Sequence, residues 1–177
     1  MKSVLISIRP KWCTKILSGE KTVEIRRTRP LLEPPFRGYL YCTEENWARD
    51  AQNRLWRTDS DGEKHLLNGR VIGEFVCSGI HKIQANANLP ANLQIAACMT
   101  ASEAYMYLGS SPGFGWRISD LRLYKQPREL KEFRRVCREE LRCESCAMHR
   151  EYEESCGNET LHLSRAPQSW CYVEESV

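Results

Sequence analysis

Three charged side chains of both signs lie close together near the N-terminus. Lys21, Glu24 and Arg26 belong to the stretch GEKTVEIR, which begins at Gly19. Lysine and arginine bind phosphate, and glutamate accepts hydrogen bonds from the exocyclic amine of cytosine or orients a lysine. A lysine also serves as a nucleophile or base once it is neutral, which burial and Arg26 favour and Glu24 opposes. The same spacing also suits a Glu24–Arg26 ion pair on a solvated strand.

The residues before this trio predict a strand and a helix. Residues 3–8 (SVLISI) form an apolar run typical of a strand. Pro10 suits the first position of a helix, and the apolar period that follows it ends at Gly19, a residue typical of helix ends. Arg9 joins the two elements, so it either lines a cleft beside the first strand or lies on the open surface.

The trio itself lies on a predicted strand over residues 21–27. Alternation places Val23 and Ile25 on one face, with Glu24 and Arg26 on the other, about 6.6 Å apart along the strand. A core on the apolar face leaves the charged face for a cleft or for water.

Further along the chain, the pattern predicts more strands than helices. Strand patterns occur at residues 38–43, 71–77, 116–124 and 168–174. The capping box at Thr100 predicts a helix that ends at Gly109. Two insertions are expected: 44–68 as a long hairpin, and 128–159 as a helical, cysteine-rich segment whose helix spans 128–142. About six strands separated by loops as often as by helices favour the α+β class, as a small mixed barrel with helices at its rim.

Trp116 follows a predicted tight turn, Gly113–Gly115. An aromatic ring on such a turn can stack on a splayed base, and a tryptophan at the start of a strand can equally belong to the core. Trp12 and Trp170 lie in apolar periods, which indicates packing.

Four of the nine cysteines crowd into one hydrophilic stretch. Cys143 and Cys146 form a CxxC motif, Cys137 precedes it and Cys156 follows it. This spacing resembles a zinc-ligand set, in which His149 is the alternative to Cys137 as fourth ligand. The stretch is therefore either a structural zinc site or a loop of reduced cysteines, and a disulfide is a further alternative in an oxidising setting.

The composition predicts one cytoplasmic domain over residues 1–177. The chain is 41% hydrophobic and 28% charged, with a net charge of +3. No apolar run approaches the roughly 20 residues of a membrane helix, and no secretory signal is recognisable, so we expect no membrane partner. Residues 1–39 hold nine Lys or Arg against three Asp or Glu, which is consistent with a polyanionic partner.

The stretch GEKTVEIR matches the GxKxxExR signature of the ASCH (activating signal cointegrator homology) domain at every specified position. The leading SIRPKW and the final PQSWCYVEE also resemble this family, in the variety typical of bacterial and prophage proteins. The resemblance runs from Ser3 to Val177, and residues 44–68 and 143–159 fit it least.

This resemblance implies a PUA-like barrel whose cleft, between the barrel and its helices, holds RNA or a nucleotide. Some small members remove the acetyl group from N4-acetylcytidine with a lysine, a threonine and a glutamate. Lys21 matches that lysine, whereas Glu24 stands in the place of the threonine. The ligand-binding residues expected here are Arg9, Gly19, Lys21, Glu24, Arg26 and Trp116.

Three functions follow as hypotheses. The first is a module that binds RNA or a modified nucleoside. The alternative is a hydrolase of an acylated cytidine nucleoside or of RNA, in which Lys21 and Glu24 are catalytic. The third is a protein-interaction adaptor that uses the cysteine-rich loop and the acidic C-terminal segment.

Overall fold

The protein is an α+β fold built on one mixed sheet with few helices. The computed structural model describes residues 2–44, 54–85, 89–137, 149–150 and 155–174. Its strands are β1 (Lys2–Ile8), β2 (Val23–Arg26), β3 (Phe36–Cys42), β4 (Trp56–Thr58), β5 (Lys64–Leu66), β6 (Arg70–Ile83), β7 (Gly113–Arg128), β8 (His149–Arg150), β9 (Ser155–Cys156) and β10 (Trp170–Glu174). Its helices are α1 (Pro10–Leu17), α2 (Ala91–Ala97) and α3 (Ala101–Leu108), with the 3-10 helices η2 (Leu130–Glu132) and η5 (Glu159–Leu161).

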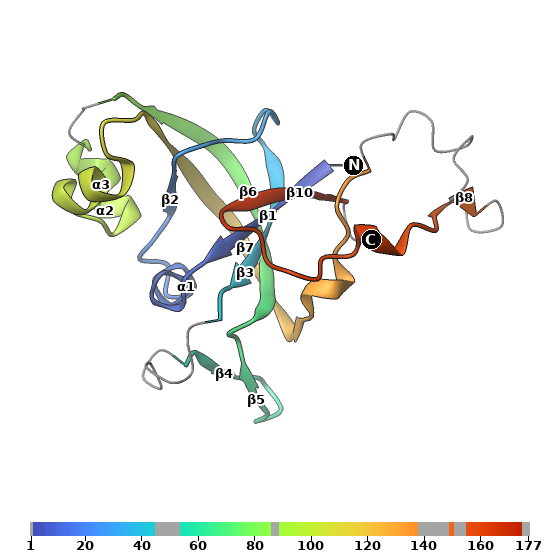
Figure 1. Ribbon diagram of the computed structural model, residues 1–177. Helices are drawn as coiled ribbons and strands as arrows, with labels where there is room; N and C mark the ends of the chain where they lie inside the picture. Colours follow the sequence, from blue (N-terminus) through green and yellow to red (C-terminus); the bar gives the residue numbers. More distant parts are fainter. Residues whose placement is uncertain (1, 45–53, 86–88, 138–148, 151–154, 175–177) are drawn as a thin grey trace.

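Six strands form the main sheet, in the order β10-β1-β3-β6-β7-β2 (Figure 1). β1 and β3 run parallel, and every other neighbouring pair of this sheet is antiparallel. Helices α2 and α3 lie together beyond β2, and the β4–β5 hairpin projects from another end of the sheet (Figure 1). This hairpin falls within residues 44–68, where the sequence predicts an insertion. Among the described helices, none is long and apolar enough to cross a membrane.

The sheet curls without closing, so the predicted barrel is open on one side. β2 and β10 are the two edges, and within the described chain no backbone ladder joins them. Side chains bridge the gap instead: Trp170 Nε1 donates to Thr28 Oγ1 at 3.0 Å. β2 has only four residues, and the Arg26 guanidinium at its end donates to Ser7 O of β1.

Both faces of β1 are buried, which explains its continuous apolar run. Val4, Ile6 and Ile8 pack inside the curl, whereas Leu5 packs on the outer face, which Phe133 helps to cover. The sequence period of a half-buried strand is therefore absent here, as expected where a sheet is covered on both sides.

The alternation predicted for β2 is confirmed. Val23 and Ile25 pack with Leu93 of α2 and Leu108 of α3. The charged residues between them point to the opposite side, so the helices cover one face of β2 and leave the other to the site described below.

β7 is one continuous strand of 16 residues that includes Gly113–Gly115, where the sequence predicts a tight turn. The prediction of a turn is therefore wrong. The two glycines serve close packing instead of a turn. A Cβ at position 113 would lie 2.7 Å from Leu108 Cδ2, and one at position 115 would lie 3.0 Å from Val23 Cγ1. Helix α3 and strand β2 can therefore approach β7 closely.

The helix predicted over 128–142 is not formed in its described part. η2 covers only three residues, and Arg134 and Arg135 form isolated bridges to the C-terminal segment. Phe133 explains the difference, since its buried ring packs edge-on against Tyr39 with the ring centroids 5.0 Å apart. Packing against the sheet overrides the local helical pattern.

Candidate functional site

A cleft of about 720 Å³ lies at the open side of the sheet. The ends of β1 and β2, the segment before β10, and residues of α1 and α3 surround it. Its lining residues are Ser7, Arg9, Trp12, Lys21, Glu24, Ile25, Arg26, Arg27, Thr28, Thr43, Met99, Tyr107, Pro167, Gln168 and Ser169. Parts of the chain that are far apart in sequence thus converge where the ladder stays open.

Lys21, Glu24 and Arg26 meet in this cleft as an ion-pair triad. Lys21 Nζ lies 3.2 Å from Glu24 Oε2, and Arg26 Nη2 lies 3.1 Å from Glu24 Oε1. The three residues are only 2%, 7% and 8% exposed. The structure therefore brings together the trio that the sequence singles out, and this burial excludes an ion pair on a solvated strand.

Lys21 is the most enclosed of the three, and its contacts all suit a positive charge. Its Nζ donates to Ala97 O at 2.7 Å and lies 4.9 Å from the centre of the Trp12 ring, within cation–π range. Ala97 is the last residue of α2, and carbonyl groups at a helix C-terminus lack helical partners. Gly19, at φ +77°, lets the chain turn between α1 and β2. Gly19 is itself exposed and is not among the residues that line the cleft.

Arg26 connects the two sides of the cleft. Its Nη2 donates to Ser7 O at 2.5 Å, and Ser7 Oγ in turn donates to Pro167 O at 2.7 Å. Within the described chain, Arg26 Nε is buried without a hydrogen-bond partner, and Glu24 Oε2 accepts no well-directed hydrogen bond despite its ion-pair contact. A buried polar atom left unsatisfied costs about 1–3 kcal/mol, so the triad is not arranged for stability alone.

The rim of the cleft carries two further arginines and two aromatic rings. Arg9 is exposed and forms no side-chain hydrogen bond or ion pair with the rest of the described chain. Arg27 donates to Tyr107 O from two nitrogens, at 3.0 Å and 2.5 Å, and lies 5.4 Å from the centre of the Tyr107 ring. Trp12 is half-buried, and Lys11 Nζ lies 4.7 Å from its ring centre.

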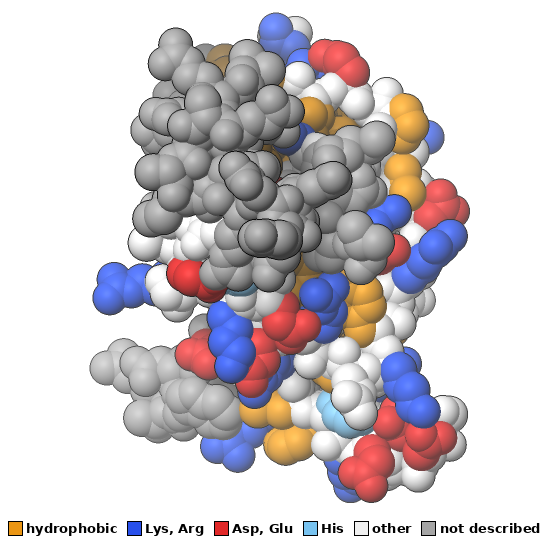
Figure 2. Space-filling model, turned by 90° about the vertical axis from the view of Figure 1, so that its right-hand side faces the viewer, with side chains coloured by type: hydrophobic (Ala, Val, Ile, Leu, Met, Phe, Trp, Pro, Cys, Tyr) orange, Lys and Arg blue, Asp and Glu red, His pale blue; other side chains and the backbone are white. Residues whose placement is uncertain are grey.

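The lining of the cleft is therefore basic and partly aromatic, with four Lys or Arg side chains against one glutamate. Figure 2 shows a different arrangement on the side that carries the C-terminal segment, where basic and acidic side chains are intermixed. Cations hold phosphate groups and aromatic rings stack on bases, so the cleft suits an anionic ligand with a flat ring.

Trp116 does not reach the cleft. It is fully buried inside the curl, between Phe36 and Trp170, with each pair of ring centroids 5.9 Å apart. Of the two alternatives for Trp116, stacking on a base and packing in the core, the structure supports packing in the core, because β7 directs this side chain inward. Trp12, which the sequence assigns to packing, both packs against the core and lines the cleft.

Sequence reasoning misses most of the other lining residues, and Tyr107, Met99 and Ser7 show why. Tyr107 and Met99 come from the α2–α3 region, and no local pattern links them to the charged trio. Ser7 has a weak signal, since it is a polar residue inside the apolar run of β1. Its role depends on a partner, Pro167, that lies 160 positions away.

The predicted zinc site falls mostly outside the described residues. This holds for Cys143 and Cys146 and for the side chains of Cys156 and His149, so the zinc site stays a prediction. Cys137 is described and is a half-buried free thiol. Elsewhere in the described chain, no group of three or more His, Cys, Asp or Glu is placed to hold a metal.

The cysteines outside the cysteine-rich stretch include packing residues. Cys13, Cys42 and Cys77 are buried free thiols, and Cys98 is half-buried. Burial, and then a hydrogen bond with Cys42, raises the pKa of the Cys13 thiol. Burial raises the pKa of Cys77 to about 11. Neither thiol is therefore a reactive thiolate at neutral pH.

Comparison with known proteins gives a family match and a fold match. The sequence model of the ASCH domain matches residues 6–155. The crystal structure of ASCH from Zymomonas mobilis is similar with a TM-score of 0.54 and 20% identity, over 98% of this chain and 88% of that chain. A point-mutant form from the same organism gives a TM-score of 0.53 and 21% identity, over 99% and 92% of the two chains. Among proteins of curated function, none matches.

Proposed function

Because the chain belongs to the ASCH domain family, we propose that its basic cleft binds single-stranded RNA or a modified nucleoside. The observation that supports this most is that one hollow combines aromatic rings with available cations. Trp12 and Tyr107 supply rings for a base, and Arg9 and Arg27 supply charge for phosphate. Grooves that bind single-stranded nucleic acid combine these two components.

The triad forms the polar part of this proposed site. Glu24 lines the cleft between two cations, and a carboxylate has about four acceptor positions, more than Lys21 and Arg26 use. An exocyclic amine of a base, such as that of cytosine, is a suitable donor for it. Lys21 and Arg26 hold the carboxylate in its orientation from both sides, so Glu24 selects for a donor group on the ligand.

A hydrolase of acylated cytidine or of RNA is the second candidate. The contact between Lys21 and Glu24 in the cleft favours it, because a lysine and a carboxylate side by side can share proton transfer. Binding ranks first for a physical reason. A lysine base or nucleophile must be neutral, whereas Ala97 O, Glu24 and the Trp12 ring all stabilise the ammonium form.

The first test measures binding with a variant that leaves the triad intact. Fluorescence anisotropy with a 5′-labelled oligocytidylate should show weaker affinity for Arg9→Gln, because Arg9 is exposed and its charge is available to phosphate. Lys82→Gln removes one exposed charge from β6, outside the cleft, and is the matched control. Equal affinity of the two variants and the parent would contradict binding at this cleft.

The second test separates binding from hydrolysis. The parent and Lys21→Met are incubated with N4-acetylcytidine, cytidine and oligocytidylate, and the products are followed by chromatography. We expect no product from either protein. Product formed by the parent and lost in a folded Lys21→Met variant would instead establish the hydrolase, with Lys21 as the catalytic residue.

A further inference from the structure

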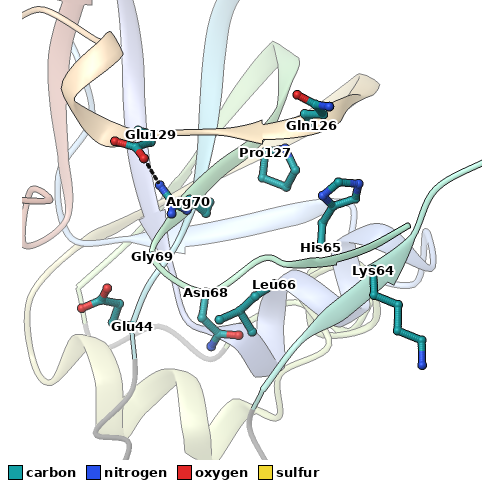
Figure 3. A pocket seen from close by; sticks show the side chains of 10 residues that line it. All are labelled: Glu44, Lys64, His65, Leu66, Asn68, Gly69, Arg70, Gln126, Pro127 and Glu129. Carbon is teal, nitrogen blue, oxygen red and sulfur yellow. Dashed lines mark ion pairs between the residues drawn. The ribbon is translucent and has the colours of Figure 1, made fainter. Parts of the chain in front are cut away.

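Two further hollows continue the cleft along the molecule. The middle hollow, of about 540 Å³, shares Thr43 with the cleft, and residues 163–166 in its wall lead directly into residues 167–169 of the cleft. The far hollow, of about 550 Å³, adjoins the middle one at Arg70 and Glu129, which line both (Figure 3). The cleft, the middle hollow and the far hollow therefore adjoin one another in series, and we call this series the groove.

The charge of the lining falls along this groove. The cleft is lined by Arg9, Lys21, Arg26 and Arg27 against Glu24. The middle hollow is lined by Arg70, Lys131 and Arg165 against Glu44 and Glu129. The far hollow is lined by Lys64 and Arg70 against Glu44 and Glu129, with His65 counted as neutral. The formal charge thus falls from +3 through +1 to zero, so a polyanion is attracted to the cleft and the middle hollow only.

Arg165 is the cation of the middle hollow that is available to a ligand. Glu129 lies 3.0 Å from Arg70 Nη1 and 2.8 Å from Lys131 Nζ, so it neutralises the other two in part. Arg165 is exposed and has no ion pair or side-chain hydrogen bond within the described chain. It stands two residues before Pro167, so the segment that forms the cleft wall also presents this charge.

The Arg70–Glu129 pair marks the end of the basic part of the groove. Figure 3 shows this pair at one edge of the far hollow, with Lys64 and His65 on the opposite side. Beyond it the lining has no net charge, and the far hollow offers a polyanion no electrostatic gain.

We propose that the middle hollow takes the sugar–phosphate chain that continues from a base held in the cleft, with Arg165 at a phosphate. This inference rests on the proposed function and specifies the ligand as a single-stranded oligonucleotide. A free nucleoside has no chain to occupy the middle hollow. A duplex does not fit, because its bases are paired and stacked, whereas a recessed triad receives only a splayed base.

The test uses the whole protein and varies the length of the oligonucleotide ligand. Affinities are measured by competition for cytidine monophosphate and for oligocytidylates of increasing length. Affinity should rise with oligomer length up to about four nucleotides and then level off, as for the shorter single-strand binding sites. Arg165→Gln should weaken the binding of the longer oligomers, leave that of cytidine monophosphate unchanged, and lower the salt slope by about 0.7. Between 50 and 200 mM salt, that slope change is about 2.6-fold in affinity.

A matched variant locates the effect. Lys64→Gln removes one exposed charge from the far hollow and should leave the whole series unchanged. Affinity independent of length, or equal effects of Lys64→Gln and Arg165→Gln, would overturn the proposed path while leaving the cleft as a binding site. Absence of binding at every length would overturn the proposed function itself.

Discussion

The cleft and the far hollow are both polar hollows lined by ion pairs, yet they hold their charges differently. In the cleft, the side chains of Lys21, Glu24 and Arg26 are 1%, 9% and 10% exposed. In the far hollow, those of Arg70 and Glu129 are 42% and 44% exposed. Exposed ion pairs contribute little to stability. Buried charges carry a desolvation cost that their mutual attraction often does not offset. Buried charge, and not the size of a hollow, therefore distinguishes the candidate site.

The largest expected effect is on stability when the buried carboxylate loses its charge. Glu24→Gln leaves two buried cations without an anion, and we expect a loss of about 3–5 kcal/mol in the free energy of unfolding. Urea denaturation measures it. Glu129→Gln removes the corresponding charge from the exposed pairs and should change the midpoint only slightly. Similar midpoints for the two variants would remove the distinction between the two hollows.

Removing Lys21 should cost less than removing Glu24. Lys21→Met keeps an apolar chain against Trp12 and leaves the Glu24–Arg26 pair neutral as a unit. The main loss is the hydrogen bond to Ala97 O, for which we expect about 1–3 kcal/mol in the same denaturation experiment. A greater loss than that of Glu24→Gln would show that Lys21, and not the carboxylate, organises the triad.

The third prediction concerns ligand affinity. Trp12→Ala should weaken oligocytidylate binding by about 1–3 kcal/mol, because one stacked base loses its platform. Trp12→Phe keeps a ring and should retain most of the affinity. Trp56→Ala is the control, since Trp56 is 52% exposed on the β4–β5 hairpin beside the far hollow and not in the cleft. Denaturation of each variant separates lost stacking from lost folding.

The smallest expected effect is a local response to acid at the far hollow. A hydrogen bond from His65 is the main cause that lowers the pKa of Asp59, and the amides of Asp61 and Glu63 also donate to this carboxylate. A lowered pKa in the folded state stabilises the hairpin above the ordinary aspartate pKa of about 3.9, and this stability is lost as the pH falls through the lower value.

Amide hydrogen exchange at Asp61 and Glu63 measures this effect. Their protection factors should fall below about pH 3.9 while those of the main sheet persist. In Asp59→Asn, the pH-dependent step should disappear. A step that persists in this variant would assign it to another group and leave the polar residues of the far hollow without a role in holding the hairpin.

Local patterns of the sequence are sufficient for the elements that carry the charged triad. The apolar run of β1, the helix from Pro10 and the alternation in β2 depend on neighbours in the chain, and the structure confirms all three. The alternation places Glu24 and Arg26 on one face of a short strand. The capping box at Thr100 likewise begins α3, and its hydrogen bonds are present.

Local patterns fail where packing between distant segments decides the conformation. Residues 128–137 have a helical period, but burial of Phe133 against the sheet holds them in a largely extended form. Gly113–Gly115 has the composition of a turn, but its lack of side chains allows α3 and β2 to approach β7. Trp116 is in the core for the same reason, because β7 continues through it.

The sequence by itself determined which charges share a strand face and that this face belongs to an ASCH domain. Only the tertiary structure decided that the face is buried, that Ala97 O and Trp12 complete the surroundings of Lys21, and that a second hollow, lined by Arg165, adjoins the cleft. The physical reason is range. Alternation and capping act over a few residues, whereas burial and electrostatic surroundings depend on segments that meet only when the sheet curls.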